Sequence, residues 1–315
     1  MRLRELGGVV RCAHVARDCV NYLALGALVR AAGDALAWSG AGEDAKNLFH
    51  WAVAARGLWS SSWCRPSAAF PVASPQPFVY DAPCHAALFE YIIRPFEELS
   101  GMIATEAGAA LRLHGARQAD SGFQRESAGL VEGVGGGWGS WDVLALSVDG
   151  ALRERVCVAW PATCDLVRGL PELGVRSGQV KLSVLGAGAH VRPHAGPTNA
   201  RLRMHCGIDI PLTGASMRVA TRNITWQNGR CFVFDESCEH ELYQRGATPR
   251  SVLLVDFANP LLASFEAYLG SLRASERARS EHHHRRWSEF QDGWSECSGR
   301  RGVLTTVVAP DAGAT

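Results

Sequence analysis

Three histidines and three arginines, side chains that can hold a metal ion and carboxylates, are concentrated between residues 181 and 259. They lie in or at the ends of short apolar segments: His194, His205, His240, Arg201, Arg203 and Arg250. Iron(II) oxygenases commonly use two histidines and one carboxylate, which leaves three coordination positions for a co-substrate and oxygen. Arginine offers a planar fork that holds a carboxylate through two hydrogen bonds. These residue types fit an iron site with an anionic co-substrate beside it.

His194 and His240 are the candidate iron ligands, because each falls at a junction between a loop and a predicted strand. The carboxylate expected two residues after the first histidine is missing, since Gly196 stands there. Two interpretations stay open on spacing alone. The pair either binds iron or consists of two polar histidines at turns.

Strand alternation sorts the cationic residues by face. Arg201, Arg203 and His205 share one face of their predicted strand. In two other predicted strands, Ser183 shares a face with Lys181, and Arg250 shares one with Val252, Leu254 and Asp256. Cations inside a barrel are costly unless an anion meets them. The pattern therefore indicates a cavity suited to carboxylates, or else an outer sheet face on which the arginines meet solvent.

Seven short segments, rich in β-branched or aromatic residues, must position these side chains. They are residues 179–185, 201–211, 216–221, 224–227, 230–234, 241–244 and 250–257. Asn228-Gly229 is the strongest two-residue hairpin signal in the series. Residues 141–148 alternate as an earlier strand. Such a succession of short strands is typical of a sandwich or jelly roll.

The chain before these strands is predicted to be helical. Apolar residues recur at three- and four-residue steps over 22–32 and 45–58, which predicts two helices joined by Ser39-Gly-Ala-Gly42. Residues 1–62 are then a helical lead-in packed on the main domain, or a remnant of a helical repeat array. A further helix is expected over 81–110, with Pro95 able to kink it.

Three other segments are interpreted without a catalytic role. Residues 133–139 lack the Lys-Ser/Thr of a phosphate loop and are expected to form a flexible loop. Residues 271–315 are charged and expected to form a poorly ordered tail; within it, His282-His283-His284 is interpreted as a solvated helical face or disordered chain. Cys157 and Cys164 flank a loop, and their separation suits either a disulfide or two free thiols.

Composition limits the class of protein. The 315 residues are 47% hydrophobic and 20% charged, which is typical of a soluble globular protein. A net charge of +1 argues against wholesale attraction to nucleic acid or anionic membrane. We expect no transmembrane segment and no signal peptide. Ten cysteines without a Cys-x-x-Cys pair leave the compartment open between the endoplasmic reticulum lumen and the cytoplasm.

The order of these motifs resembles the aspartyl/asparaginyl β-hydroxylases, a family of 2-oxoglutarate-dependent oxygenases. The similarity extends over about residues 45–265. It is carried by His190-Val-x-Pro-His194-x-Gly-Pro-Thr-Asn-x-Arg201-Leu-Arg203-Met-His205, Phe234-Asp-x-Ser237-x-Glu-His240-Glu, residues 250–256, Gly139-Ser-Trp141, the Cys157…Cys164 loop and Gly57-Leu-Trp-x-Ser-x-Trp63. Several motifs agree together and in order, so the resemblance is specific.

The resemblance implies a mainly β protein with a double-stranded β-helix (jelly-roll, cupin-like) core over residues 63–270. It places Fe(II) on two histidines with no protein carboxylate. The glycine at position 196 therefore agrees with the family pattern. The ligand set that it implies is His194 and His240 for iron, Ser183 and Arg250 for 2-oxoglutarate, and Trp141, Arg203 and His205 around the co-substrate. Arg201 and Arg203 would lie near carboxylates of co-substrate or substrate, and Cys157 would be disulfide-bonded to Cys164.

The implied reaction uses O2 and 2-oxoglutarate, yields succinate and hydroxylates the β-carbon of an aspartyl or asparaginyl residue in a peptide or protein. Other relatives hydroxylate a lipid acyl chain, and a free or carrier-bound amino acid is a further alternative. A third interpretation is a non-catalytic β-barrel module that binds a carboxylate ligand. The intact histidines and arginines argue against a retired site, because buried charges are costly to keep.

Overall fold

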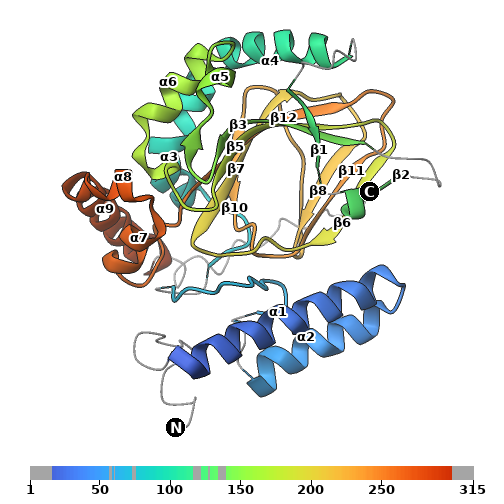
Figure 1. Ribbon diagram of the computed structural model, residues 1–315, viewed down its shortest axis with the longest axis vertical. Coiled ribbons are helices and arrows are strands. Elements are labelled where there is room, and N and C mark those ends of the chain that lie inside the picture. Colours follow the sequence, from blue (N-terminus) through green and yellow to red (C-terminus); the bar gives the residue numbers. More distant parts are fainter. Residues whose placement is uncertain are drawn as a thin grey trace, which may run out of the picture.

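The computed structural model describes residues 16–56, 59, 61–72, 76–115, 122–126, 128–133 and 140–299. Of the segments singled out in the sequence, residues 1–15, most of the glycine-rich loop, parts of the Gly57–Trp63 motif and residues 300–315 lie outside this described part. Within it, two antiparallel β-sheets face each other and helices lie on both sides of them (Figure 1). The expected jelly-roll core with a helical lead-in is confirmed.

The larger sheet has the order β1-β3-β5-β12-β7-β10, with β4 paired to β3. Its members are β1 (Gln124–Arg125), β3 (Trp141–Val148), β4 (Ala151–Leu152), β5 (Gln179–Leu185), β7 (Arg201–Asp209), β10 (Cys231–Phe234) and β12 (Arg250–Ala258). The long central strands β5, β12 and β7 are adjacent although far apart in sequence. This crossover brings the predicted co-substrate residues onto neighbouring strands.

The smaller sheet has the order β2-β6-β11-β8-β9. Its members are β2 (Val131–Gly133), β6 (Ala189–His194), β8 (Ala215–Val219), β9 (Arg222–Ile224) and β11 (His240–Gln244). Sequence reasoning missed β6 and read His190 as part of a turn. The antiparallel pairing of β6 with β11 sets His194 directly opposite His240.

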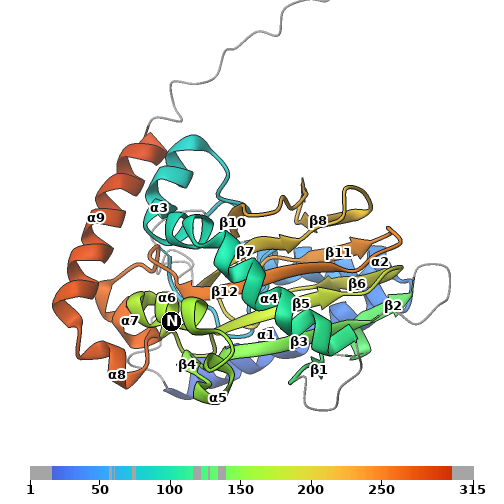
Figure 2. The ribbon, with the colours of Figure 1, turned by 90° about the horizontal axis from the view of Figure 1, so that it is seen from above.

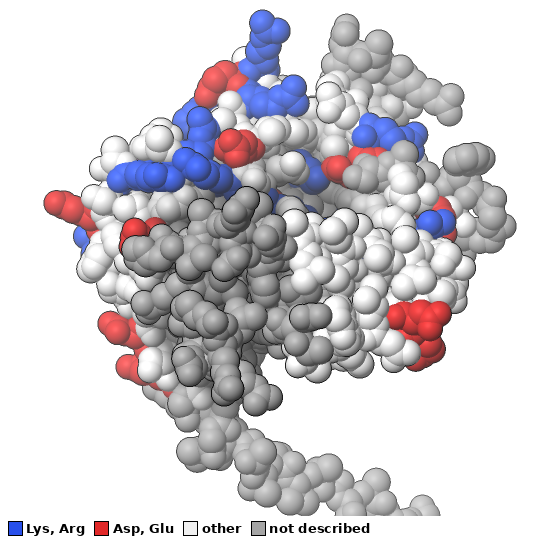
Figure 3. Space-filling model, turned by 60° about the horizontal axis from the view of Figure 1, so that its bottom comes forward, with Lys and Arg blue, Asp and Glu red and all other residues white. Residues whose placement is uncertain are grey.

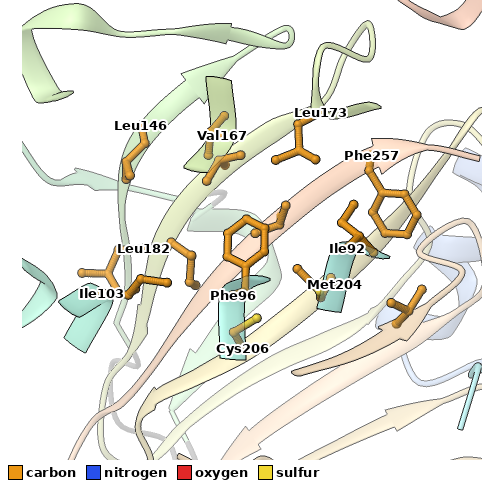
Figure 4. Packing of buried hydrophobic residues seen from close by; sticks show 14 of the residues in the cluster. Ile92, Phe96, Ile103, Leu146, Val167, Leu173, Leu182, Met204, Cys206 and Phe257 are labelled. Carbon is orange, nitrogen blue, oxygen red and sulfur yellow. The ribbon is translucent and has the colours of Figure 1, made fainter. Parts of the chain in front are cut away.

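The two faces of the larger sheet have different partners. Leu202, Met204 and Cys206 of β7 point into an apolar core that the sheet shares with helices α3 (Pro83–Glu98) and α4 (Ser100–Gly115) (Figure 4). The opposite face of this sheet meets the smaller sheet in a second core, whose buried residues include Trp141, Phe234 and Val252. The alternation that the sequence predicted for β7 therefore leaves its arginines and histidine between the sheets.

The helices divide between the two sides of this sandwich. Helices α3, α4, α5 (Glu154–Cys157) and α6 (Pro161–Gly169) lie outside the larger sheet, and α1 (Ala16–Trp38) and α2 (Gly42–Arg56) form an antiparallel pair on the other side (Figures 1 and 2). The α1–α2 hairpin was predicted. The helix expected over 81–110 is two helices, α3 and α4, with Pro95 in the last turn of the first.

Two sequence expectations differ from the structure. Residues 271–299, expected to be poorly ordered, form α8 (Ala274–Arg277) and α9 (Ser280–Gly299), which follow α7 (Phe265–Ser271). Helix α9 buries Phe290 and Trp294 in the core beside α3, so the charged sequence conceals an apolar face. Asn228-Gly229 does turn the chain, with φ of +72° at Gly229, but β9 and β10 on either side belong to different sheets. None of the described helices is long and apolar enough to cross a membrane.

Candidate active site

His194 and His240 come together in the smaller sheet, where the end of β6 lies beside the start of β11. Their ring centroids are 4.2 Å apart, because the register of β6 against β11 makes them direct cross-strand partners. His240 is buried, and the ring of Phe234 from the larger sheet lies 5.5 Å from it. The separation of the two rings is within the reach of one metal ion.

Hydrogen bonds to the backbone determine the tautomer of both histidines. Nδ1 of His194 lies 2.8 Å from the carbonyl oxygen of Arg192, and Nδ1 of His240 lies 2.9 Å from that of Cys238. A carbonyl only accepts, so Nδ1 carries the proton in each ring and Nε2 keeps a free lone pair. Burial lowers the pKa of His194 to about 4 and that of His240 well below its usual value. Both imidazoles are therefore neutral near pH 7, the form that binds metals.

The N-terminal helices hold the segment that follows His194. Arg30 of α1 donates to the carbonyl oxygens of Ala195, at 2.6 Å, and Gly196, at 3.1 Å. Trp38 at the end of α1 donates through Nε1 to the carbonyl of Pro193, at 3.1 Å. The backbone on both sides of the first histidine is thus fixed by a helix that lies far upstream in the sequence.

The segment that carries His240 is tied to the same helix. Arg65 donates to Glu239 at 2.8 Å and lies 3.6 Å from Asp34 of α1, while Arg65 itself is almost fully buried. Cys64 forms a disulfide with Cys238, whose carbonyl oxygen holds the His240 ring. Both histidine segments therefore rest on the helical lead-in.

Arg250 is buried and has no acidic partner in the described part of the chain. It is 1% exposed, its Nε and Nη1 have no hydrogen-bond partner, and its guanidinium lies 4.4 Å above the ring of Trp226. Burial lowers the pKa of Arg250 to about 9, which still leaves it charged at pH 7. Unpaired buried donors are costly, so this position suits an anion that the described residues do not supply.

Two further hydrogen-bond donors lie on the strands that flank Arg250. Trp141 donates through Nε1 to the Ser183 hydroxyl at 2.9 Å, which leaves the hydroxyl proton free. Trp226 donates to Nδ1 of His205 at 3.3 Å, so the His205 proton is on Nε2, and that buried atom has no partner among the described residues. Desolvation lowers the pKa of His205 well below its usual value and keeps the ring neutral.

Arg201 and Arg203 have different surroundings from Arg250. Arg203 forms two bonds to Asp256, at 2.7 and 2.9 Å, and an ion pair with Glu236 at 2.5 Å. Arg201 also pairs with Glu236 and lies 3.3 Å from Asp256. Although burial alone would raise it, these two arginines hold the pKa of Asp256 below its usual value. The anionic partners expected for these arginines from the sequence are therefore largely carboxylates of the chain itself.

Gly196 explains why no carboxylate stands beside the histidines. Its N–H donates to the carbonyl of Glu236 at 2.6 Å, and a Cβ built at Gly196 would lie 2.8 Å from the Glu236 side chain. Spacings this short are essentially never seen for a real Cβ, so a longer side chain would displace Glu236 and the arginines it pairs with. The geometry supports a two-histidine site.

The comparison with protein families decides the identity. The model of the family described as aspartyl/asparaginyl beta-hydroxylase matches residues 100–260, just over half of the chain. The chain belongs to this family.

Individual β-hydroxylases match a shorter stretch. The human aspartyl/asparaginyl beta-hydroxylase is 42% identical over 125 residues, which are 39% of this chain and 16% of that protein. The ornithine lipid ester-linked acyl 2-hydroxylase of Rhizobium tropici is 32% identical over 123 residues, 38% of this chain and 42% of that protein. The chain thus aligns with less than half of the length of either relative. Among solved structures, a Pseudomonas putida prolyl-4-hydroxylase aligns with 51% of this chain and 87% of its own, at 12% identity and a TM-score of 0.35.

Sequence reasoning missed several residues that shape this candidate site, among them Arg30, Trp38, Trp226 and Glu236. A signal existed for Arg30, since an Arg and an Asp four residues apart in an otherwise apolar helix indicate a polar contact made by the buried face. No local pattern marks Trp226 or Glu236. The structure also joins Cys157 to Cys164, with a Cα–Cα distance of 5.7 Å, although the pair lies outside the site.

Proposed function

We propose that the chain is a 2-oxoglutarate- and Fe(II)-dependent oxygenase, with His194 and His240 holding the metal. The observation that carries this proposal is the pair of neutral histidines, with Nε2 free on both, in the same inter-sheet layer as a buried arginine that lacks an internal partner. Family membership supports the same activity.

Fe(II) fits the donor set, and when bound it would supply oxygen activation. The chain's own contribution is to keep both imidazoles neutral and aimed, through the carbonyls of Arg192 and Cys238. When a histidine that binds a metal donates its other ring N–H to a carbonyl oxygen, that hydrogen bond orients the ring and raises its basicity. Gly196 leaves a coordination position without a protein ligand, which suits a centre that must accept small molecules.

The dicarboxylate 2-oxoglutarate fits the row of free donors. Arg250 would hold its distal carboxylate through Nε and Nη1, while the Ser183 hydroxyl and Nε2–H of His205 would donate from the neighbouring strands. Trp141 connects the two parts of the site, since its indole bonds Ser183 and lies 6.3 Å from the His194 ring. Buried apolar neighbours such as Val252 and Phe234 would exclude water.

For the substrate, we propose an aspartyl or asparaginyl residue of a peptide or protein. Arg203 is the candidate contact with the substrate's polar group, because its side chain stays 12% exposed beside its internal acids whereas that of Arg201 is 5% exposed. The acyl hydroxylase among the relatives makes a lipid acyl chain the second candidate. On the face shown in Figure 3, basic side chains gather mainly near one edge and acidic ones lie among them, which is not a surface built for nucleic acid.

An oxidising compartment, such as the lumen of the endoplasmic reticulum, fits the four disulfides that the structure describes: Cys64–Cys238, Cys84–Cys297, Cys157–Cys164 and Cys206–Cys231. Disulfides persist in such compartments and are rare in the cytosol. Mass spectrometry of the protein alkylated before and after reduction would test this. Alkylation of these eight disulfide cysteines before reduction would contradict it.

The activity is tested with purified protein, Fe(II), ascorbate and 2-oxoglutarate. We expect succinate formation, and one added oxygen on Asp or Asn of a disulfide-bearing growth-factor-like peptide, both abolished by His194→Ala. Acyl-chain lipids and free amino acids are assayed in parallel, and oxygen added only to those would assign the substrate class differently. A protein that binds 2-oxoglutarate by calorimetry but yields no succinate and holds no iron would instead be the non-catalytic carboxylate-binding module.

A further inference from the structure

A second cluster of metal-ligand side chains lies where α9 meets the short 3-10 helix Pro171–Leu173, far along the chain from the iron ligands. It consists of Glu172, His282 and His283, whose ligand atoms all lie within 4.8 Å of one another. We infer that this cluster is a second divalent-cation site, suited to Zn²⁺, which fastens the C-terminal helix to the oxygenase core.

Glu172 supplies a buried carboxylate. It is 1% exposed, and its Oε1 lies 3.1 Å from Nε2 of His282 and 3.6 Å from Nε of Arg286. The second distance is longer than a hydrogen bond, so the guanidinium does not close off the carboxylate. A buried carboxylate requires a cation or several donors, and here the hydrogen-bonding partner of Oε1 is a histidine that can itself bind a metal.

His283 supplies a buried imidazole nitrogen with nothing to bind in the described chain. The residue is 0% exposed, and its Nε2 lies 3.1 Å from the carbonyl oxygen of Glu276, which can only accept a proton. Nδ1 therefore holds the free lone pair, and it has no hydrogen-bond partner. A buried acceptor left in this state costs about 1–3 kcal/mol, unless an ion or a donor fills the place.

The donor set of two imidazole nitrogens and one carboxylate oxygen is that of protein zinc sites, in which such ligands lie roughly 2.0–2.2 Å from the ion. The spacing of His282 Nε2 and Glu172 Oε1 already matches two ligands of one such ion. Two other groups of metal-ligand residues in the described chain, Cys84-His85-Cys297 and Cys64-Asp235-Cys238, have their cysteines locked in disulfides. The Glu172 cluster is the one whose donors remain available.

The position of the cluster gives the ion a structural role. Cys297 near the end of α9 is joined to Cys84 of α3, so one end of this helix is covalently fastened. His282 and His283 lie in its first turn. An ion shared with Glu172 would fasten that end as well, and Phe290 and Trp294 between the two fastenings pack into the core.

The test uses full-length protein carrying His194→Ala and His240→Ala, so that the iron site cannot bind the probe. After incubation with Zn²⁺ and desalting, we expect about one zinc per chain and a higher midpoint of thermal unfolding. His283→Ala and Glu172→Gln should each weaken zinc binding at least about tenfold, since even partners of metal ligands are worth about 10–100-fold in affinity.

His284→Ala is the matched control, because His284 belongs to the same run of histidines but is exposed and lies outside the cluster. It should leave zinc affinity and the zinc-dependent rise of the melting temperature unchanged. Equal losses in the His283 and His284 variants would show adventitious binding by a histidine run and overturn the proposal. So would a parent protein that retains no zinc. Glu172→Gln preserves shape, which keeps the test valid even where His283→Ala misfolds.

Discussion

Replacement of Arg250 by methionine should stabilise the ligand-free protein and at the same time remove its affinity for 2-oxoglutarate. Nε and Nη1 of Arg250 are buried without partners, at a cost of about 1–3 kcal/mol each, and the stacking on Trp226 offsets about 1–2 kcal/mol of this. Methionine fills similar space with no polar atom to satisfy. We therefore expect the free energy of unfolding to rise by roughly 1–4 kcal/mol in the absence of co-substrate.

Binding should change in the opposite direction. Hydrogen bonds to a charged group contribute about 1.5–3 kcal/mol each, so loss of two of them should weaken 2-oxoglutarate at least about 100-fold. Calorimetric titration measures the affinity, and urea unfolding with and without 2-oxoglutarate measures both stabilities. Arg203→Met is the matched control, because that guanidinium is paired with Asp256 and Glu236, and its removal should destabilise by about 3–5 kcal/mol. If Arg250→Met destabilises the ligand-free protein as Arg203→Met does, or binds 2-oxoglutarate normally, the reasoning about an unpaired anchor is refuted.

Three further outcomes are expected. Arg30→Met should weaken iron binding at least about tenfold, because the Ala195 and Gly196 carbonyls lose their donor. Arg94→Met, on an exposed helix face, is the control and should leave iron binding unchanged. Equal iron affinities of the two variants in a competition assay would contradict this. Removal of Cys64–Cys238 by paired serines should weaken iron binding, whereas removal of Cys157–Cys164 should affect stability alone. Because the pKa of His194 is lowered to about 4, the ligand-free fold should keep its full stability above pH 6.5 and lose it as pH falls toward 4, and His194→Ala should flatten that part of a stability–pH profile.

The sequence predicted those elements whose residue types and alternation agree with their burial. Strands β3, β5 and β12 were found nearly to the residue, because β-branched and apolar residues fill them. Strand β6 was missed because His190-Val-Arg-Pro-His194 has the composition of a turn. Pro193 is tolerated there because it lies where the pairing of β6 with β11 is irregular, so its missing N–H removes no regular ladder bond.

The sequence identified the candidate ligand residues, which the structure brings together, but not their internal counter-charges. Alternation along β7 correctly put Arg201 and Arg203 together on one face, which the structure turns toward the smaller sheet. Asp256 neutralises them because β12 pairs with β7 in a register that sets Asp256 opposite Arg203. Register between strands that are far apart in the chain depends on tertiary packing and cannot be read from either strand alone. The same holds for Arg30, whose partners are backbone carbonyls that carry no sequence signal.

The contacts of α1 also bear on where the catalytic unit begins. The span that the family shares starts at residue 100, yet the groups that hold the backbone around both histidines, Arg30, Trp38, Cys64 and Arg65, all precede it. A fragment cut to the matched span would keep every proposed metal and co-substrate ligand but lose the contacts that orient the two histidine segments. The length of chain that the site needs for its geometry is therefore greater than the length that the family model matches.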